Sequence, residues 1–398
     1  MPAPLTFLCI ATYEKGHAFL RECKRQGCRV LLLTLDTLSQ AGWPREAIDE
    51  MFFITRGLPE ADLLKAVSYV ARTRVVDRIV ALDDLDVEMG AVLREHLRLP
   101  GMGETTARHF RDKLAMRARA RSSGILVPEF LHLLNDSQIE EFSRRVAPPW
   151  LVKPRSQAAA VGIKKAADAG ELRRICDELG DNRSFYVLEQ FVPGDVYHVD
   201  SIVSERRVVF AVPHKYSHPP LDVSHHGGIF MTRTLAPDAP ETAELEALNQ
   251  RMLEALGLVR GVTHSEFIRA HSDGRLYFLE TSARVGGANI AEVIEAATGI
   301  NLWVEWARIE IAGEQGSYKV PPHTRRFAGI VLTLAAQEHP DTSAYADPEI
   351  VLRIKKNHHA GLIVASDDAR RVEQLQADYS RRFYQDFYAT KPPPERLG

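Results

Sequence analysis

The stretch that decides the fold is residues 264–282, which read HSEFIRAHSDGRLYFLETS. Two runs rich in apolar residues flank the loop 272–274, and its length and final glycine are typical of a β-hairpin loop. Counting outward from this loop gives the expected register, which pairs Ala270 with Leu276, Ile268 with Phe278, Glu266 with Glu280, and His264 with Ser282. The sequence therefore predicts two glutamates as direct cross-strand neighbours.

The facing carboxylates of Glu266 and Glu280 need a compensating partner. Side chains in such positions have Cβ atoms about 4.5–5.5 Å apart, and like charges there destabilise the sheet. A lysine or arginine, a shared proton or a hard divalent cation would offset the repulsion, and a set of oxygen ligands suits Mg²⁺ better than zinc. Three interpretations follow from the hairpin alone: a Mg²⁺ site, a salt bridge, or a register slip that separates the two glutamates.

The composition is that of an ordinary globular protein. The chain has 398 residues, 50 Lys and Arg against 53 Asp and Glu, and a net charge of -3, so no basic balance points to nucleic acid. Its four cysteines form no CxxC pair, which argues against a disulfide framework or a structural zinc site. No secretion signal or membrane-spanning segment is recognisable, so we expect a cytoplasmic protein without a membrane partner.

The first hundred residues alternate short apolar runs with helix-like stretches, which predicts a parallel α/β sheet. They contain no GxGxxG dinucleotide fingerprint. The acidic loop Asp83, Asp84 and Asp86 follows one of the predicted strands, at the edge where α/β folds bind ligands. Substrate contact and a solvated turn are the two interpretations of this loop.

A helix is expected next, from a Thr105 or Thr106 cap to Gly124. Its basic residues other than Lys113 are interpreted as a solvated face: Arg108, Arg111, Arg117, Arg119 and Arg121. Runs of strands follow, with one hairpin at 196–203 and 208–213 and a second at 262–270 and 276–281, which indicate an α+β region. The tail ends in a helix at 367–388, whose apolar face predicts core packing or a subunit contact, so a homodimer is one candidate assembly.

Three polar residues near predicted strands suggest nucleotide chemistry. Lys153 interrupts the apolar run WLVKP, which indicates either an edge lysine or a lysine beside phosphates, because the loop 155–162 that follows has small side chains. Glu189 lies near the end of a strand, where it can hold an exocyclic amine while the following backbone contacts the ring. Asp195, after the next turn, can accept hydrogen bonds from ribose hydroxyls.

Five segments, DKLAMR, LVKP, LEQFVPGD, HSEF and LETSARVGG, occur in the order and approximate spacing of the ATP-grasp superfamily. The chain resembles this superfamily over residues 1–390, and within it the carboxylate–amine ligases related to L-amino acid ligases and biotin carboxylase. The resemblance implies a mixed α/β and α+β fold. It implies a parallel pre-ATP-grasp domain (1–103), an ATP-grasp domain (104–312) with a mobile lid at about 122–190, and a C-terminal α+β subdomain (313–398) ending in a helix.

The resemblance also assigns roles to residues. Its implied assignments are Lys113 and Lys153 at the phosphates, Glu189, Phe191 and Val192 at the adenine, Asp195 at the ribose, Glu266 and Glu280 at Mg²⁺, and Arg284 at the transferred phosphate and the substrate. Arg284 and Lys153 are the expected catalytic residues. The glycine pair 286–287 would let the backbone close around an anion before a helix at 289–298. Ser282 replaces the family's usual asparagine ligand, and Ala158, Ala159 and Ala160 replace its usual glycines and serine.

These assignments imply an ATP- and Mg²⁺-dependent ligase that joins a small carboxylate and an amine, both amino-acid-like, through an acyl phosphate and releases ADP and phosphate. Two alternatives remain: another ATP-grasp chemistry such as carboxylation, or a non-catalytic ATP-binding module, which Ser282 and the alanine loop motivate. The histidine-rich segment from His214 to His226 is compatible with a mobile loop over the substrate, a solvated surface or a metal site.

Overall fold

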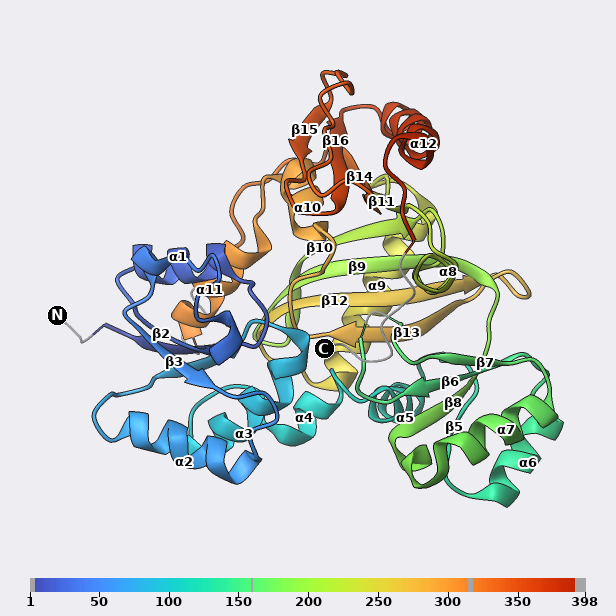
Figure 1. Ribbon diagram of the computed structural model, residues 1–398, viewed down its shortest axis with the longest axis horizontal. Coiled ribbons are helices and arrows are strands. Elements are labelled where there is room, and N and C mark those ends of the chain that lie inside the picture. The colour runs from blue at the N-terminus through green and yellow to red at the C-terminus, as the bar shows by residue number, and fades with distance from the viewer. Residues whose placement is uncertain (1–3, 159, 314–317, 391–398) are drawn as a thin grey trace.

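The computed structural model describes residues 4–158, 160–313 and 318–390. Ala159 of the alanine loop, and the side chains of His225 and His226, therefore lie outside the described part of the chain. Figure 1 shows three sheets: a parallel N-terminal sheet, a small antiparallel sheet, and a large central sheet between them that continues into the C-terminal region.

The N-terminal sheet has the strand order β3-β2-β1-β4, with all pairs parallel. Its strands are β1 (Thr6–Ala11), β2 (Arg29–Leu35), β3 (Glu50–Ile54) and β4 (Arg78–Ala81). The helices that accompany it are α1 (His17–Arg25), α2 (Glu60–Ala71) and α3 (Val87–Leu97), with short 3₁₀ turns η1 (Asp36–Leu38), η2 (Arg45–Ala47) and η3 (Asp84–Asp86). Every residue of β1 is buried, as expected for a parallel strand covered on both faces. The predicted parallel α/β sheet is confirmed.

The small antiparallel sheet has the order β5-β8-β6-β7. Its elements are β5 (Phe130–His132), α6 (Asp136–Arg145), β6 (Trp150–Pro154), β7 (Lys164–Ala166), α7 (Ala169–Leu179), η4 (Gly180–Phe185) and β8 (Tyr186–Gln190). Strand β6, which carries Lys153, lies between β8 and β7 rather than at an edge. The interpretation of Lys153 as an edge lysine is therefore wrong.

The central sheet has eight strands in the order β13-β12-β9-β10-β11-β14-β16-β15. The strands are β9 (Gly194–Ser204), β10 (Arg207–Tyr216), β11 (Phe230–Thr234), β12 (Gly261–Ala270), β13 (Leu276–Ser282), β14 (Phe327–Leu334), β15 (Ile350–Arg353) and β16 (His359–Ser366). Its helices are α8 (Pro220–His226), α9 (Pro240–Leu256), α10 (Ile290–Thr298), α11 (Leu302–Ala312) and α12 (Ala369–Asp386). This sheet runs across the predicted boundary at residue 312, because β14 pairs directly with β11.

The helix expected between Thr105 and Gly124 is two helices, α4 (Glu104–Arg108) and α5 (Lys113–Ser122). Helix α4 begins after Gly103 without a side-chain cap, so the threonine cap was a wrong prediction. Asp112 caps α5 instead, because its carboxylate accepts the N–H groups of Leu114 and Ala115 at 2.9 and 3.4 Å. This second start places Lys113 in the first turn of α5.

The hairpin of β12 and β13 keeps the predicted register only away from its loop. His264 faces Ser282 and Glu266 faces Glu280, as expected. A bulge at Leu279 then shifts the pairing by one residue. The predicted pairs Ile268–Phe278 and Ala270–Leu276 are wrong, because the structure pairs Phe267 with Phe278, Ile268 with Tyr277, and Arg269 with Leu276.

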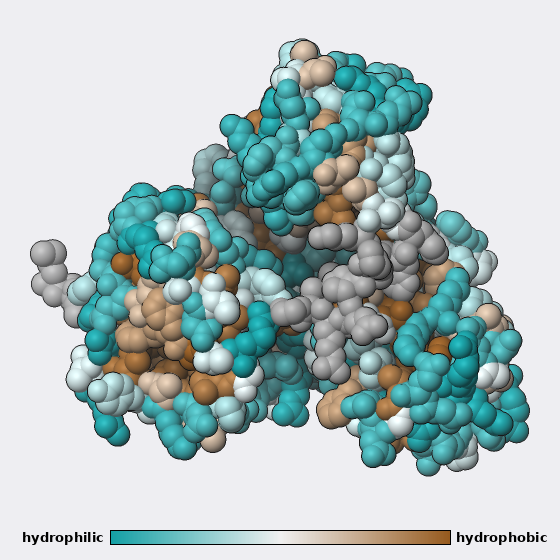
Figure 2. Space-filling view, viewed as in Figure 1, coloured by the Kyte–Doolittle hydropathy of each residue, from teal (hydrophilic) through white to brown (hydrophobic). Residues whose placement is uncertain are grey.

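Helix α12 packs its apolar face against the C-terminal strands, where Tyr379 and Phe383 are fully buried. Core packing, the first of the two predicted interpretations, is therefore confirmed for this face. Figure 2 shows a mostly hydrophilic surface with a hydrophobic area over the N-terminal region. The exposed large hydrophobic side chains of the first hundred residues are Phe53, Tyr69 and Val75. Among the described residues, none of the helices combines the length and the apolar character that a membrane crossing requires.

Candidate active site

A cavity of about 850 Å³ opens between the three sheets. Its lining includes all ten residues that the sequence singled out: Lys113, Lys153, Glu189, Phe191, Val192, Asp195, Glu266, Glu280, Ser282 and Arg284. They come from five separate places in the chain, namely α5, β6, the end of β8 with the start of β9, β12, and β13 with the loop after it. The fold thus brings together residues that the sequence only suggested as a set.

Lys113 joins α5 to the central sheet. Its Nζ lies 3.1 Å from Glu280 Oε2 and donates to the Gln157 carbonyl at 2.7 Å. One ammonium group thus links the Glu280 carboxylate to the small-residue loop 155–162. Burial alone would raise the pKa of Glu280, but the charges of Lys113 and Lys153 outweigh it and lower the pKa. The Glu280 carboxylate is therefore ionised at neutral pH.

Glu189 is the centre of a buried charge group. It is 1% exposed and accepts from Lys153 Nζ through Oε1 and from Arg117 Nε through Oε2 at 2.8 Å. Burial would raise the pKa of Glu189, yet Arg117 and Lys153 lower it. Arg117, itself 1% exposed, was predicted on a solvated face, and that prediction is wrong. The two cations hold the carboxylate that the sequence linked to an exocyclic amine.

The facing glutamates each have their own partner, which answers the question raised by their pairing. Glu280 has Lys113, and Glu266 Oε1 accepts the Tyr216 hydroxyl at 2.8 Å with His264 Nε2 3.5 Å away. The register-slip interpretation is wrong, and the salt-bridge interpretation describes contacts that exist. The paired carboxylates also form a hard oxygen donor set suited to Mg²⁺.

The remaining predicted residues lie around the same cavity. The Asp195 carboxylate accepts from Lys215 Nζ at 2.8 Å, a hydrogen bond that lowers the pKa of Asp195. Phe191 donates its backbone N–H to the Pro149 carbonyl at 3.2 Å, and its ring lies 4.2 Å from Lys165 Nζ. Arg284 donates through one terminal nitrogen to the Val285 carbonyl at 2.9 Å, while its Nε has no partner among the described residues.

The acidic loop after β4 is buried, so its interpretation as a solvated turn is wrong. Asp83, Asp84 and Asp86 are 3%, 6% and 1% exposed, and the first two line the cavity. Asp83 pairs with Lys15, and Asp84 pairs with Arg111, whose other terminal nitrogen donates to the Ser156 carbonyl. Arg111 is 4% exposed, contrary to the predicted solvated face, and it joins the N-terminal sheet to the small-residue loop.

Sequence reasoning missed a second set of polar residues beside Glu266. His198 and Asp200 on β9, and Tyr216 on β10, are buried on the sheet face that carries His264 and Glu266. A signal for them exists, because polar residues two apart recur on each strand (His198 and Asp200, His214 and Tyr216, His264 and Glu266) and a period of two marks one face of a sheet. Burial would lower the pKa of His264, but Asp200 and Glu266 raise it to about 9.

The histidine-rich segment is not a loop for most of its length. His214 lies on β10 and is fully buried, and the end of the segment forms α8, whose Leu221 and Val223 line the cavity. The solvated-surface interpretation is therefore wrong for His214, whereas His218 and Asp222 are exposed. Whether α8 moves over a substrate stays a prediction.

Residues 146–292 match the family model described as ATP-grasp domain. The match contains the small-residue loop, Glu189, the facing glutamates and Arg284, and it coincides with the region that forms most of the cavity. The match identifies an ATP-grasp domain within residues 146–292 of the chain. The predicted mixed α/β and α+β fold is likewise confirmed.

The chain is also similar to individual proteins of known name, in sequence or in structure. The chain is 27% identical over 242 residues to the L-arginine-specific L-amino acid ligase of Bacillus subtilis, a match that spans 59% of the chain and 58% of that relative, less than two thirds of its length. The crystal structure of an L-amino acid ligase from Bacillus licheniformis aligns with a TM-score of 0.75 and 18% identity over 98% of the chain and 100% of that protein. The N5-carboxyaminoimidazole synthetase from Staphylococcus aureus, solved with ADP, aligns with a TM-score of 0.71 and 16% identity over 94% and 97%.

Proposed function

We propose that the protein is an ATP- and Mg²⁺-dependent ligase that joins the carboxylate of one amino-acid-like substrate to the amine of another and releases ADP and phosphate. One observation carries the proposal: a single cavity contains two buried lysines, an arginine and a facing pair of glutamates, the charges needed to bind and transfer a γ-phosphoryl group. The similarity to ligases of amino acids supports the substrate class.

In this function the substrate carboxylate attacks the γ-phosphoryl group of ATP to give an acyl phosphate and ADP, and the amine then displaces phosphate. Lys113 and Lys153 neutralise the phosphate oxygens, and Arg284 faces the transferred phosphoryl group and the substrate carboxylate. The protein supplies no covalent nucleophile, so its contribution is positioning and charge stabilisation. Asp195, held by Lys215, is assigned to the ribose, and Phe191 and Val192 to the adenine.

The donors available to Mg²⁺ are the carboxylates of Glu266 and Glu280 and the hydroxyl of Ser282, all of which line the cavity. This set fits a hard cation that accepts oxygen ligands and retains water. When bound, Mg²⁺ supplies charge neutralisation at the phosphates. Ser282 reaches less far than the usual asparagine, so we assign it to contact through water.

The substrate end of the cavity is assigned to the N-terminal loops and α8. Tyr13, Lys15 and Asp83 line the cavity from one side, and Leu221 and Val223 line it from another. The Gly287 backbone and the start of α10, also part of the lining, provide a seat for a carboxylate or phosphate. A cytoplasmic location and a homodimer complete the proposal as predictions.

Replacing Lys153 by methionine tests the phosphate role. The substitution removes one charge next to the phosphates and keeps the stem, and Glu189 retains Arg117, so the fold should persist. We expect about tenfold weaker binding of a non-hydrolysable ATP analogue, because a hydrogen bond to a charged group contributes about 1.5–3 kcal/mol. Calorimetric titration measures it, with Lys164→Met as the control, since exposed Lys164 pairs with Glu178 nearby. Equal affinity of the Lys153 variant and the wild type would remove Lys153 from the nucleotide site.

Product analysis distinguishes the proposed chemistry from its alternatives. Transfer of only the γ-phosphoryl group predicts ADP and phosphate in amounts equal to the ligated product. AMP and pyrophosphate would instead indicate adenylation, and dependence on bicarbonate would indicate carboxylation. Nucleotide binding without turnover, whatever amino acids are added, would favour the non-catalytic module.

A further inference from the structure

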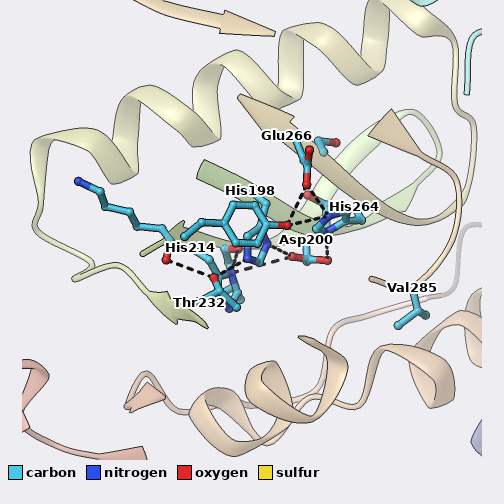
Figure 3. A network of polar contacts seen from close by, with 12 residues as sticks. His198, Asp200, His214, Thr232, His264, Glu266 and Val285 are labelled. Atoms are coloured by element: carbon cyan, nitrogen blue, oxygen red, sulfur yellow. Dashed lines mark hydrogen bonds and ion pairs between the residues drawn. The ribbon is translucent and has the colours of Figure 1, made fainter. Parts of the chain in front are cut away.

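A chain of buried polar groups leads across the central sheet to Glu266, one of the two facing glutamates. Figure 3 shows it as a row of contacts from Thr232 through His198 and Asp200 to His264 and Glu266. His198 Nε2 lies 2.7 Å from the Thr232 hydroxyl, His198 Nδ1 2.6 Å from Asp200 Oδ2, and Asp200 Oδ1 3.0 Å from His264 Nδ1. His198, Asp200 and Thr232 are 0% exposed, so these contacts are shielded from solvent.

The geometry makes Asp200 the hub of this chain. Its two carboxylate oxygens face different rings, with His198 on one and His264 on the other. The remaining nitrogen of His264 lies 3.4 Å from the Tyr216 hydroxyl and 3.5 Å from Glu266 Oε1, the oxygen to which Tyr216 donates. Tyr216 and His264 therefore both contact Oε1 of Glu266. Among the contacts of the described residues, this leaves Oε2 of Glu266 available to a cation.

The backbone after β13 closes over the same groups. A Cβ added to Gly286 would lie 2.8 Å from Asp200 Oδ1 and 3.2 Å from His264 Nδ1, so only glycine lets the chain pass this close. The close approach restricts the Asp200 carboxylate and the His264 ring from the side opposite β9. The first glycine of the pair, expected to close around a bound anion, instead packs against the protein's own carboxylate.

We propose that Asp200 is a positioning residue, which orients the His264 ring and through it fixes the Glu266 carboxylate as a ligand for the divalent cation. This inference rests on the proposed function, because it takes Glu266 as a metal ligand. Mutation of a group that orients the ligands of a metal typically lowers metal affinity or activity by about 10–100-fold. The three groups His198, Asp200 and His264 lie close enough to hold a metal ion themselves, but the direct hydrogen bonds already satisfy the Asp200 carboxylate.

The test measures Mn²⁺ binding by electron paramagnetic resonance in the presence of a non-hydrolysable ATP analogue, so that it does not depend on turnover. Asp200→Asn keeps the side-chain shape and is expected to weaken Mn²⁺ binding about tenfold, the lower end of typical effects for such supporting residues. Affinity for the analogue measured without a divalent cation should change less than twofold. Ser201→Ala is the matched control, because Ser201 is also fully buried on β9 but faces the other side of the sheet. The substitution likewise removes one buried hydrogen bond, which Asn249 donates to the Ser201 hydroxyl at 2.8 Å.

A double-mutant cycle separates positioning from a general loss of structure. His264→Gln retains an N–H donor near the position of Nε2 but does not need Asp200 to orient a ring. If Asp200 acts through His264, Asp200→Asn should add less than a twofold effect in the His264→Gln background. Additive effects, or a folded Asp200→Asn variant that binds Mn²⁺ as the wild type does, would overturn the inference.

The test also covers misfolding of Asp200→Asn and a wild type that binds no Mn²⁺. If Asp200→Asn does not fold, His198→Gln replaces it, because it removes the 2.6 Å contact to Asp200 and retains an amide near Thr232. It should weaken Mn²⁺ binding by less than the roughly tenfold expected for Asp200→Asn, and unchanged binding would overturn the inference. A wild-type protein that binds no Mn²⁺ with the analogue would contradict the proposed metal site itself, and so the proposed function.

Discussion

Replacing Glu280 by glutamine is expected to lower the rate of ADP formation about 1000-fold. The substitution removes half of the facing carboxylate pair at the position that Lys113 links to the small-residue loop. A divalent cation at a transferring phosphoryl group contributes several kcal/mol to the transition state, and a loss of about 4 kcal/mol corresponds to this factor. Steady-state ADP formation measures it, with Glu295→Gln on α10 as the control for a carboxylate elsewhere.

Thermal melting in metal-free buffer gives the second half of this test. The Glu280 side chain is 37% exposed to the cavity, and a glutamine oxygen there can still accept from Lys113. The variant should therefore melt close to the wild type or slightly below it, because the bond to Lys113 remains and only the charge contribution of a partly exposed pair is lost, about 0–1 kcal/mol. A variant that melts far lower without metal and retains its activity would mean that Glu280 serves only as the ion-pair partner of Lys113.

Replacing Arg117 by methionine is expected to lower the free energy of unfolding by about 3–5 kcal/mol. Arg117 and Glu189 are each 1% exposed, and removal of one partner of a buried ion pair leaves a charge without compensation. Here Lys153 still contacts Glu189, which places the expected loss toward the lower end. Urea denaturation measures it, and Arg121→Met is the control one turn further along α5, where an exposed pair with Glu129 contributes about 0–1 kcal/mol.

The pH dependence of this difference is a further check. Arg117 and Lys153 lower the pKa of Glu189 in the folded protein below its unfolded value of about 4.3. A group with a lowered folded pKa stabilises the protein above the unfolded pKa, and the contribution is lost as the pH falls through the folded pKa. The difference between the wild type and Arg117→Met should be full at pH 6–8 and shrink below about pH 4. A difference that is the same at all pH values would mean that Arg117 stabilises the fold by packing and not by charge.

The pairing of Glu266 with Glu280 could be predicted because a short loop and the period of two fix a hairpin register locally. The bulge at Leu279 could not, since an extra residue in a strand is accommodated by contacts with neighbouring strands rather than by a sequence signal. The order of motifs along the chain was sufficient to group ten of the residues that line the cavity. It could not show that the central sheet continues past residue 312, because strand neighbours are set by tertiary packing.

The buried charges were the main failure. Arg111 and Arg117 were predicted on a solvated face because helical spacing shows which residues share a face but not what that face contacts. Their partners Asp84 and Glu189 are 27 and 72 residues away in sequence. The chain from His198 to Glu266 was missed for the same reason, because each strand carries only two of its members and only the sheet order brings them together.

A screen of amino acid pairs with ATP and Mg²⁺ tests the proposed ligase activity most directly, with phosphate release as the signal and mass spectrometry of the product as the confirmation. We expect at least one pair to stimulate phosphate release, with ADP, phosphate and a dipeptide or related amide formed in equal amounts. The same pair should give no product with Glu280→Gln. If a protein that binds the ATP analogue and Mn²⁺ releases phosphate at the same rate with and without amino acids and forms no amide, the assignment as a carboxylate–amine ligase is wrong.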